Sequence, residues 1–407
     1  MDQPLPVRES VLRHPGYLNF AASRVFSSLG FQSIAIAMGW MVYDQTKSAF
    51  ALGLVGLFQF LPMVFLTFIV GDVADRFDRR RIGLACQLVE AVTVLVLGIA
   101  VWYNVLHPVG IFCAVAVLGA AQAFERPTMA SLLPNIVPPS LLQQAIATST
   151  SMMQTALIVG PSLGGLLYGI GPVVPFMVST VLFAIASLNV ISIRMERKVA
   201  SREPVTLASV FAGVSFIRSR PVMLGTISLD LFAVLLGGAT ALLPIFASDI
   251  LQAGPWGLGL LRAAPAVGAL GMSIVLARWP IQDNVGRKMF LSVGVFGLAT
   301  IVFAISTSIA LSVLALLIVG ASDAVSVVIR SSLVQLLTPD AMRGRVNAVN
   351  SLFIGTSNQL GEFESGMLAG FVGPVTTGVI GGLGTITVVL LWMRLFPDLT
   401  KVKTLSG

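Results

Sequence analysis

Gly71–Arg81 reads G-D-V-A-D-R-F-D-R-R-R and carries three aspartates and four arginines. It lies between two long apolar runs, Phe50–Val70 and Ile82–Trp102. Only 11% of the chain is charged, so this stretch concentrates charges that hydrocarbon cannot hold. We therefore expect a short hairpin in water that joins two membrane-crossing helices.

Composition extends this interpretation to the whole chain. Of its 407 residues 56% are hydrophobic, whereas a soluble domain has about 25% charged residues, more than twice the fraction here. Apolar runs of about 20 residues, each long enough to span a bilayer, recur along the sequence, and the alternating pattern of a β-barrel does not. The sequence predicts an all-α membrane protein.

Twelve spans are predicted. They are 17–43, 49–70, 82–104, 108–133, 143–170, 172–193, 222–247, 256–278, 288–307, 309–337, 346–371 and 374–396. Basic residues crowd the termini and the loops after even-numbered spans, and Lys47 alone lies in a loop on the other side. By the positive-inside rule, both termini and Gly71–Arg81 are expected in the cytoplasm.

Several functional classes find no support in the sequence. The net charge of +7 lies in short loops, which does not favour a nucleic-acid partner. Cys86 and Cys113 fall within spans, and His14 and His107 are far apart, so we expect neither a disulfide nor a metal site. There is no phosphate-binding loop and no catalytic constellation, so we expect neither a cofactor nor an enzyme.

The two halves of the chain repeat. A shift of 201 residues aligns Gly119 with Gly320, Pro138 with Pro339, Ala147 with Ala348, Gly160 with Gly361, Gly165 with Gly366 and Gly169 with Gly370. A shift of 206 aligns Pro15 with Pro221, Arg24 with Asp230 and Phe26 with Phe232. Parallel six-helix halves are typical of secondary transporters, with the substrate site near the midplane.

The predicted organisation is therefore a six-helix bundle at 1–193, a linker at 194–220 and a second six-helix bundle at 221–407. Apolar residues three and four apart within the linker predict an amphipathic helix at the cytoplasmic surface. Two interpretations stay open for it, a plain spacer and a regulatory element.

The stretch Gly71-x-x-Ala74-Asp75-Arg76-x-x-Arg79-Arg80 resembles the loop signature of the major facilitator superfamily, with Asp78 in place of the usual second glycine. Its D-R-F-D-R-R-R form looks like the branch of the enterobactin exporter and drug-efflux proteins. Two further stretches agree, Glu125-Arg126-Pro127 and the exporter-like Gly160–Gly165.

The resemblance implies that Gly71, Asp75, Arg76, Arg79 and Arg80 form a conformational latch, with Asp75 at the N-terminus of span 11 and the arginines paired with acids. It would stabilise the outward-facing state. In span 5, Gly160, Pro161, Gly164 and Gly165 serve either helix bending or close helix packing.

Charges within spans are costly, so they indicate function. As proton-coupling candidates we name Asp230, Asp323 and Glu364, with Glu362 next; the alternative for the two glutamates is a helix–helix hydrogen bond. Glu362 shares a stripe with Gly366 and Gly370 that suits close packing. Glu90 is expected to pair with a cytoplasmic arginine.

The superfamily lines its cavity with helices 1, 4, 7 and 10, which implies a hydrated place for most of these charges. The expected substrate-cavity residues are Arg24, Gln32, Met38, Gln59, Arg126, Gln154, Arg262 and Arg330. Arg24 and Asp230 either pair across the halves in one transport state or reach water near the span ends. Arg262 either reaches the far interface or binds an anionic group.

Together these features predict a monomeric exporter in the lipid of a bacterial inner membrane. It would use the proton gradient to export siderophore-like or amphipathic drug-like molecules, since methionine-rich walls adapt to varied shapes. The alternatives are a lipid or lysolipid flippase, an importer of the same fold, and a membrane sensor that does not transport.

Overall fold

The computed structural model describes residues 11–193 and 207–404. The first half is built from α1 (Pro15–Thr46), α2 (Ala49–Arg76), α3 (Arg79–Trp102), α4 (Pro108–Ile136), α5 (Leu142–Ile170) and α6 (Val174–Ile191), with short 3₁₀ turns at Val11–Arg13 and Pro139–Leu141. After α7 (Leu207–Arg218) the second half comprises α8 (Pro221–Leu236), η3 (Ala239–Leu242), α9 (Leu243–Ile245), η4 (Phe246–Ile250), α10 (Gly254–Arg278), α11 (Val285–Ile305), α12 (Ile309–Leu337), α13 (Asp340–Val372), α14 (Pro374–Leu395) and α15 (Pro397–Lys401).

The all-helical membrane fold is confirmed. Eleven segments in the described part of the chain are long and apolar enough to cross a membrane. Helix α13 is as long, with 33 residues, but is more polar, because it carries Arg343, Arg345, Glu362 and Glu364 together with several Asn, Ser and Gln residues. With α13, the number agrees with the twelve predicted spans.

The seventh predicted span differs from the expectation of one continuous helix. Helix α8 ends at Leu236, and the chain continues through η3, α9 and a π-helical turn, η4. The break falls at Gly237 and Gly238, where a methyl group added to Gly238 would meet the carbonyl oxygen of Gly361. Because α13 approaches so closely, only glycine fits at Gly238.

The internal repeat appears as repeated backbone contacts between helices. Gly119 of α4 lies against the backbone of Gln59 in α2, and Gly320 of α12 lies against that of Pro265 in α10. Across the halves, Gly165 of α5 approaches Gly259 of α10, and its repeat partner Gly366 of α13 approaches Gly53 of α2. Small residues therefore set the helix spacing in both halves, as expected for membrane bundles.

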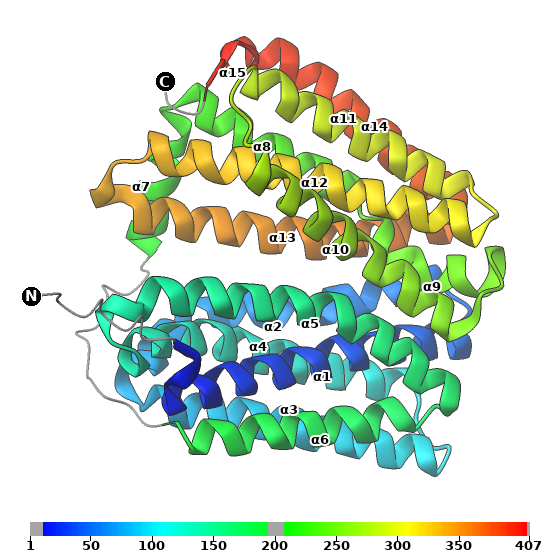
Figure 1. The fold of residues 1–407 in the computed structure, drawn as a ribbon. Coiled ribbons are helices and arrows are strands. Elements are labelled where there is room, and N and C mark those ends of the chain that lie inside the picture. Colours follow the sequence, from blue (N-terminus) through cyan, green and yellow to red (C-terminus); the bar gives the residue numbers. More distant parts are fainter. Residues whose placement is uncertain (1–10, 194–206, 405–407) are drawn as a thin grey trace, which may run out of the picture.

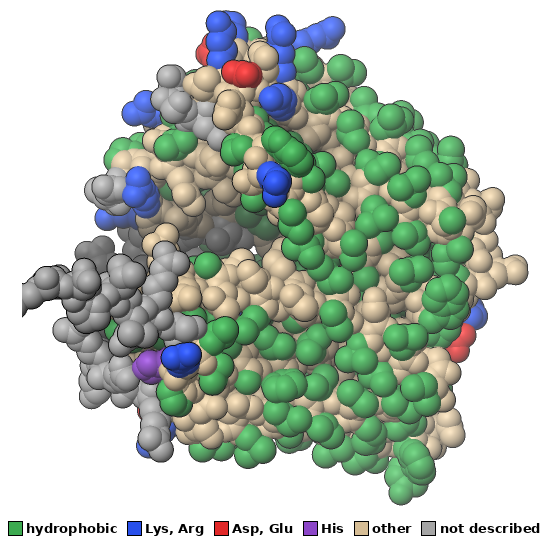
Figure 2. Space-filling view, in the orientation of Figure 1, with side chains coloured by type: hydrophobic (Ala, Val, Ile, Leu, Met, Phe, Trp, Pro, Cys, Tyr) green, Lys and Arg blue, Asp and Glu red, His purple; other side chains and the backbone are tan. Residues whose placement is uncertain are grey.

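The two halves lie side by side and meet more closely at one end (Figure 1). The other end, which we call the basic end, carries the α2–α3 turn, α7 and both ends of the described chain (Figure 1). Figure 2 shows Lys and Arg side chains gathered there, hydrophobic side chains over the flank and a hollow between the halves. The described molecule is thus open at the basic end.

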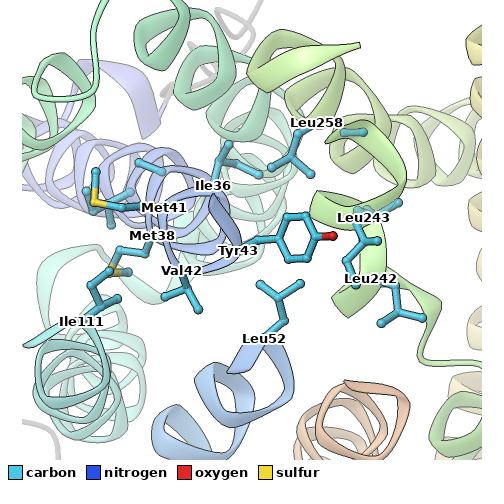
Figure 3. Close-up of a cluster of buried hydrophobic side chains, with 14 of the residues drawn as sticks. Ile36, Met38, Met41, Val42, Tyr43, Leu52, Ile111, Leu242, Leu243 and Leu258 are labelled. Carbon is cyan, nitrogen blue, oxygen red and sulfur yellow. The ribbon is translucent and has the colours of Figure 1, made fainter. Parts of the chain in front are cut away.

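At the far end, where α9 lies, a buried apolar cluster joins the halves. Figure 3 shows Tyr43 of α1 pointing toward Leu242 and Leu243, with Leu52 and Leu258 beside it. Gly39 of α1 lies opposite Pro244 of α9, and a methyl group added there would make ordinary contact with the proline ring at 3.8 Å. This cluster closes the far end of the bundle.

Candidate functional site

A small cavity of about 60 Å³ lies between the halves, and Leu52 of the far-end cluster is one of its lining residues. It brings together the predicted residues Met38, Gln59 and Arg262. Its other lining residues include Phe31, Gly56, Leu118, Pro244 and Glu362. Both halves supply walls, which is the position expected for a substrate site in a two-half transporter.

Glu362 and Arg262 form the ionic centre of this cavity. Arg262 Nη2 lies 3.9 Å from Glu362 Oε1, and the two side chains are 33% and 24% exposed. The same glutamate packs against Gly56 of α2, where an added methyl group would lie 3.2 Å from its Cβ. Glu362 therefore touches helices of both halves, and Arg262 faces the cavity rather than the far interface.

The second half also holds a buried ion pair between α8 and α12. Arg330 Nη1 donates to Asp230 Oδ2, and the side chains are only 5% and 7% exposed. Asp323 lies two turns before Arg330 on α12 and has no hydrogen bond or ion pair to another described residue. It lines one cavity with Asp230 and a second, of about 180 Å³, with Glu362.

In the first half, a cavity of about 350 Å³ brings together four residues of interest. These are the predicted Arg24, Gln32 and Arg126, and Glu125. Glu125 accepts hydrogen bonds from Ser27 at 3.0 Å, from Gln87 at 2.9 Å and from Gln122 at 3.1 Å. All these donors are neutral groups.

Gln122 links the two buried acids of this half. Its amide nitrogen also donates to Glu90 Oε1 at 2.7 Å, and its oxygen accepts from Arg126 Nε at 2.7 Å. Glu90 pairs with this amide and not with the arginine that the sequence led us to expect. The sequence analysis did not predict Gln87, Gln122 and Ser27 as members of this network. The signal that indicates it is the spacing of polar residues three and four apart on α3 and α4, which places them on one helix face.

Three sequence predictions are not supported by the contacts in this structure. Arg24 and Asp230 line separate cavities and do not pair, and Asp230 is instead bound by Arg330 within its own half. Glu364 is half-buried, with only Ser365 at 3.5 Å as a hydrogen-bond partner among the described residues. Gln154 is exposed and is not a wall residue of these cavities, although its neighbour Met153 is.

The α2–α3 turn can be described only in part, since the side chain of Asp75 and residue Gly71 lie outside what the structure describes beyond their helical backbone. Asp78 accepts a hydrogen bond from the backbone N–H of Arg80 at 2.9 Å and so caps α3. Arg80 donates to the backbone carbonyl of Ile193 at 3.1 Å, and among the described residues no acid pairs with it. The latch role of this turn, including Arg76 and Arg79, stays a prediction.

The glycines of span 5 lie at helix contacts. Gly160 and Gly164 face Gln32 and the backbone of Ser33 in α1, while Gly165 faces α10. Pro161 lies within the continuous helix α5. These contacts favour close packing, one of the two interpretations; bending stays a prediction.

A hydrogen bond from the Tyr43 hydroxyl to the Asp249 carboxylate joins the halves at the far end. Tyr43→Phe is expected to loosen this closure, because it removes a charge-assisted bond while keeping the ring. In a variant lacking Cys86 and Cys113, a cysteine at buried Leu243 should then react several-fold faster with an impermeant maleimide. Tyr103→Phe, at an exposed position, is the matched control. Unchanged labelling in Tyr43→Phe would contradict the prediction.

Comparison with known proteins agrees with this geometry. The family model described as transmembrane secretion effector matches residues 6–404. The multidrug efflux pump Tap of Mycobacterium tuberculosis is 24% identical over 400 residues, covering 94% of each chain. The enterobactin exporter EntS of Citrobacter koseri is 25% identical, covering 96% of this chain and 94% of its own.

Solved transporters share the fold. A variant of the nucleoside transporter NupG superimposes with a TM-score of 0.74 at 16% identity, covering 94% of this chain and all of that one. A bacterial homologue of ferroportin gives 0.68 at 16% identity over 96% of this chain and 100% of its own. On the evidence of its near full-length match, the chain belongs to the transmembrane secretion effector family of major facilitator transporters.

Proposed function

We propose that this protein is a secondary active exporter that carries siderophore-like or amphipathic drug-like molecules by alternating access. The observation that carries the proposal is the cavity between the halves, with apolar walls around the Arg262–Glu362 pair. The efflux activities named for its relatives Tap and EntS support it. Both walls come from one chain, so the proposed functional unit is a monomer.

The proposed orientation places both termini and the basic end in the cytoplasm of a bacterial cell, since Lys and Arg favour that side of the inner membrane. The described conformation would then be inward-facing, ready to take up substrate from the cytoplasm. The two bundles at 1–193 and 221–407 would move as units about the linker at 194–220. Its helix α7 packs on α13, where Gly213 meets the backbone of Arg345.

The proposed energy source is proton entry through the second half. Asp323 and Glu362 line one cavity, so a proton could pass between them without crossing lipid. Glu362 also contacts α2 and Arg262, so a change in its charge would alter how strongly the two halves are held together. Glu364 lies off these cavities, which makes it the weaker candidate.

Deletion of the gene is expected to raise the cellular content of an exported drug or siderophore several-fold, and the uncoupler-sensitive part of its efflux should disappear. The measurement is accumulation of a compound panel in the deletion strain, with and without a plasmid copy. Lower uptake on deletion would instead indicate an importer, and a lipid-only phenotype would indicate a flippase. Either outcome would contradict the proposed function.

A further inference from the structure

The four arginines of the membrane-embedded cavities divide into two kinds. In the second half, Arg330 is paired with Asp230 and Arg262 with Glu362. In the first half, Arg126 donates one hydrogen bond among the described residues, to the neutral Gln122, and Arg24 has no hydrogen bond or ion pair to any described residue. Both first-half arginines line the same cavity of about 350 Å³.

The acid that lines the same cavity, Glu125, already has its hydrogen-bond partners. Both oxygens of Glu125 accept bonds from neutral donors, Ser27, Gln87 and Gln122. Glu125 lines the same cavity as Arg24 and Arg126 but bonds to neither arginine. A carboxylate in the cavity makes it less costly to hold cationic groups in the membrane, and here it leaves the guanidinium donors unoccupied by an acid.

A guanidinium carries five N–H donors in a planar fork that matches a carboxylate or phosphate. Arg24 and Arg126 both line the cavity, and apart from the bond from Arg126 Nε to Gln122 their donors have no partner among the described residues. Ser27, Ser28 and Gln32 add neutral polar groups, and Phe31, Met153 and Leu157 supply an apolar wall. Two cationic forks beside an apolar wall suit an amphiphile with an anionic head.

We propose that Arg24 and Arg126 form an anion-binding subsite that selects substrates carrying a carboxylate or phosphate group on an apolar body. This deepens the proposed export function and rests on it. In the inward-facing state the subsite would receive the head group from the cytoplasm, with the body lying toward Phe31, a residue that also lines the cavity between the halves. The shared chemistry admits two sources, a soluble organic anion and an anionic lysolipid.

The test measures equilibrium binding to the purified full-length protein with a matched probe pair, 1-naphthylacetate and the uncharged 1-naphthylacetamide. The wild type should bind the anion more tightly. Arg24→Gln and Arg126→Gln should each weaken anion binding about tenfold, since each removes a charge-assisted bond, and leave amide binding within about twofold. Arg278→Gln, at the exposed end of α10, is the matched control and should change neither.

Arg24→Lys keeps the charge without the fork and should retain part of the preference, which a merely structural role would not produce. Competition by lysophosphatidylglycerol but not by lysophosphatidylcholine would identify the lipid source; displacement by neither, with the naphthylacetate preference intact, would identify the soluble anion. A wild type that does not prefer the anion overturns the proposal, as does equal loss of both probes in the glutamine variants. If cells show no efflux but the purified protein still prefers the anionic probe, the export function is contradicted and the anion-binding subsite is not.

Discussion

Asp230→Ala is expected to lower the stability of the protein more than any other single substitution considered for the second half. The carboxylate is buried against Arg330, and its removal leaves a guanidinium without a counter-charge between α8 and α12. Breaking a buried pair by removing one partner costs about 3–5 kcal/mol. The measurement is thermal unfolding of the purified protein in detergent, with monodispersity followed by size-exclusion chromatography.

The double variant Asp230→Asn with Arg330→Gln is the matched control. It removes both charges, and Asn keeps the shape of the aspartate while the shorter Gln keeps a polar group that can hydrogen-bond to it. It should therefore recover most of the lost stability, since removing a buried pair together costs less than leaving one charge alone. Arg262→Gln should cost less, because that ion pair is longer and partly exposed. Unchanged unfolding of Asp230→Ala, or a double variant as unstable as the single one, would contradict the prediction.

The fold was predictable because eleven of the spans are longer and more apolar than a soluble domain needs. The repeat shifts also anticipated real contacts: Gly165 and Gly366, aligned by sequence, make related contacts across the halves. The break in the seventh span after Leu236 was not predictable, because the apolar run continues through it. The need for glycine at Gly238 follows only from the close approach of α13.

Only part of the candidate site was predictable as a set of residues: Met38, Gln59 and Arg262 line one cavity, whereas Gln87 and Gln122 were not predicted. The partners of the charged residues were not predictable. Arg24 and Asp230 occupy matching positions in the two repeats, but they do not pair. The carboxylate of Asp230 instead accepts a hydrogen bond from Arg330, which is 100 residues further along the chain. The link from Glu90 through Gln122 to Glu125 depends on how α3 turns against α4, which periodicity alone does not fix. Pairing between helices depends on tertiary packing. The sequence therefore identifies the charged groups, but not which of them pair.

Glu362→Gln is expected to reduce gradient-driven efflux at least about tenfold while exchange of substrate across the membrane persists. The amide fills the same space between Gly56 and Arg262 but cannot take up and release a proton. The measurement uses proteoliposomes and a compound identified by the accumulation assay, comparing transport under an imposed pH gradient with counterflow at equal pH. Asp323→Asn, in the same cavity, should act in the same direction.

Glu364→Gln is the matched control, because it makes the same change two residues along α13 at a side chain away from the described cavities. It should keep both gradient-driven efflux and counterflow. The decisive comparison is between the two rates within each variant, since a misfolded transporter loses both. Retained gradient-driven efflux in Glu362→Gln would contradict a role of the Arg262–Glu362 pair in proton coupling. Selective loss of gradient-driven efflux in Glu364→Gln would contradict it too, and would assign the coupling to Glu364, on the face of α13 outside the described cavities.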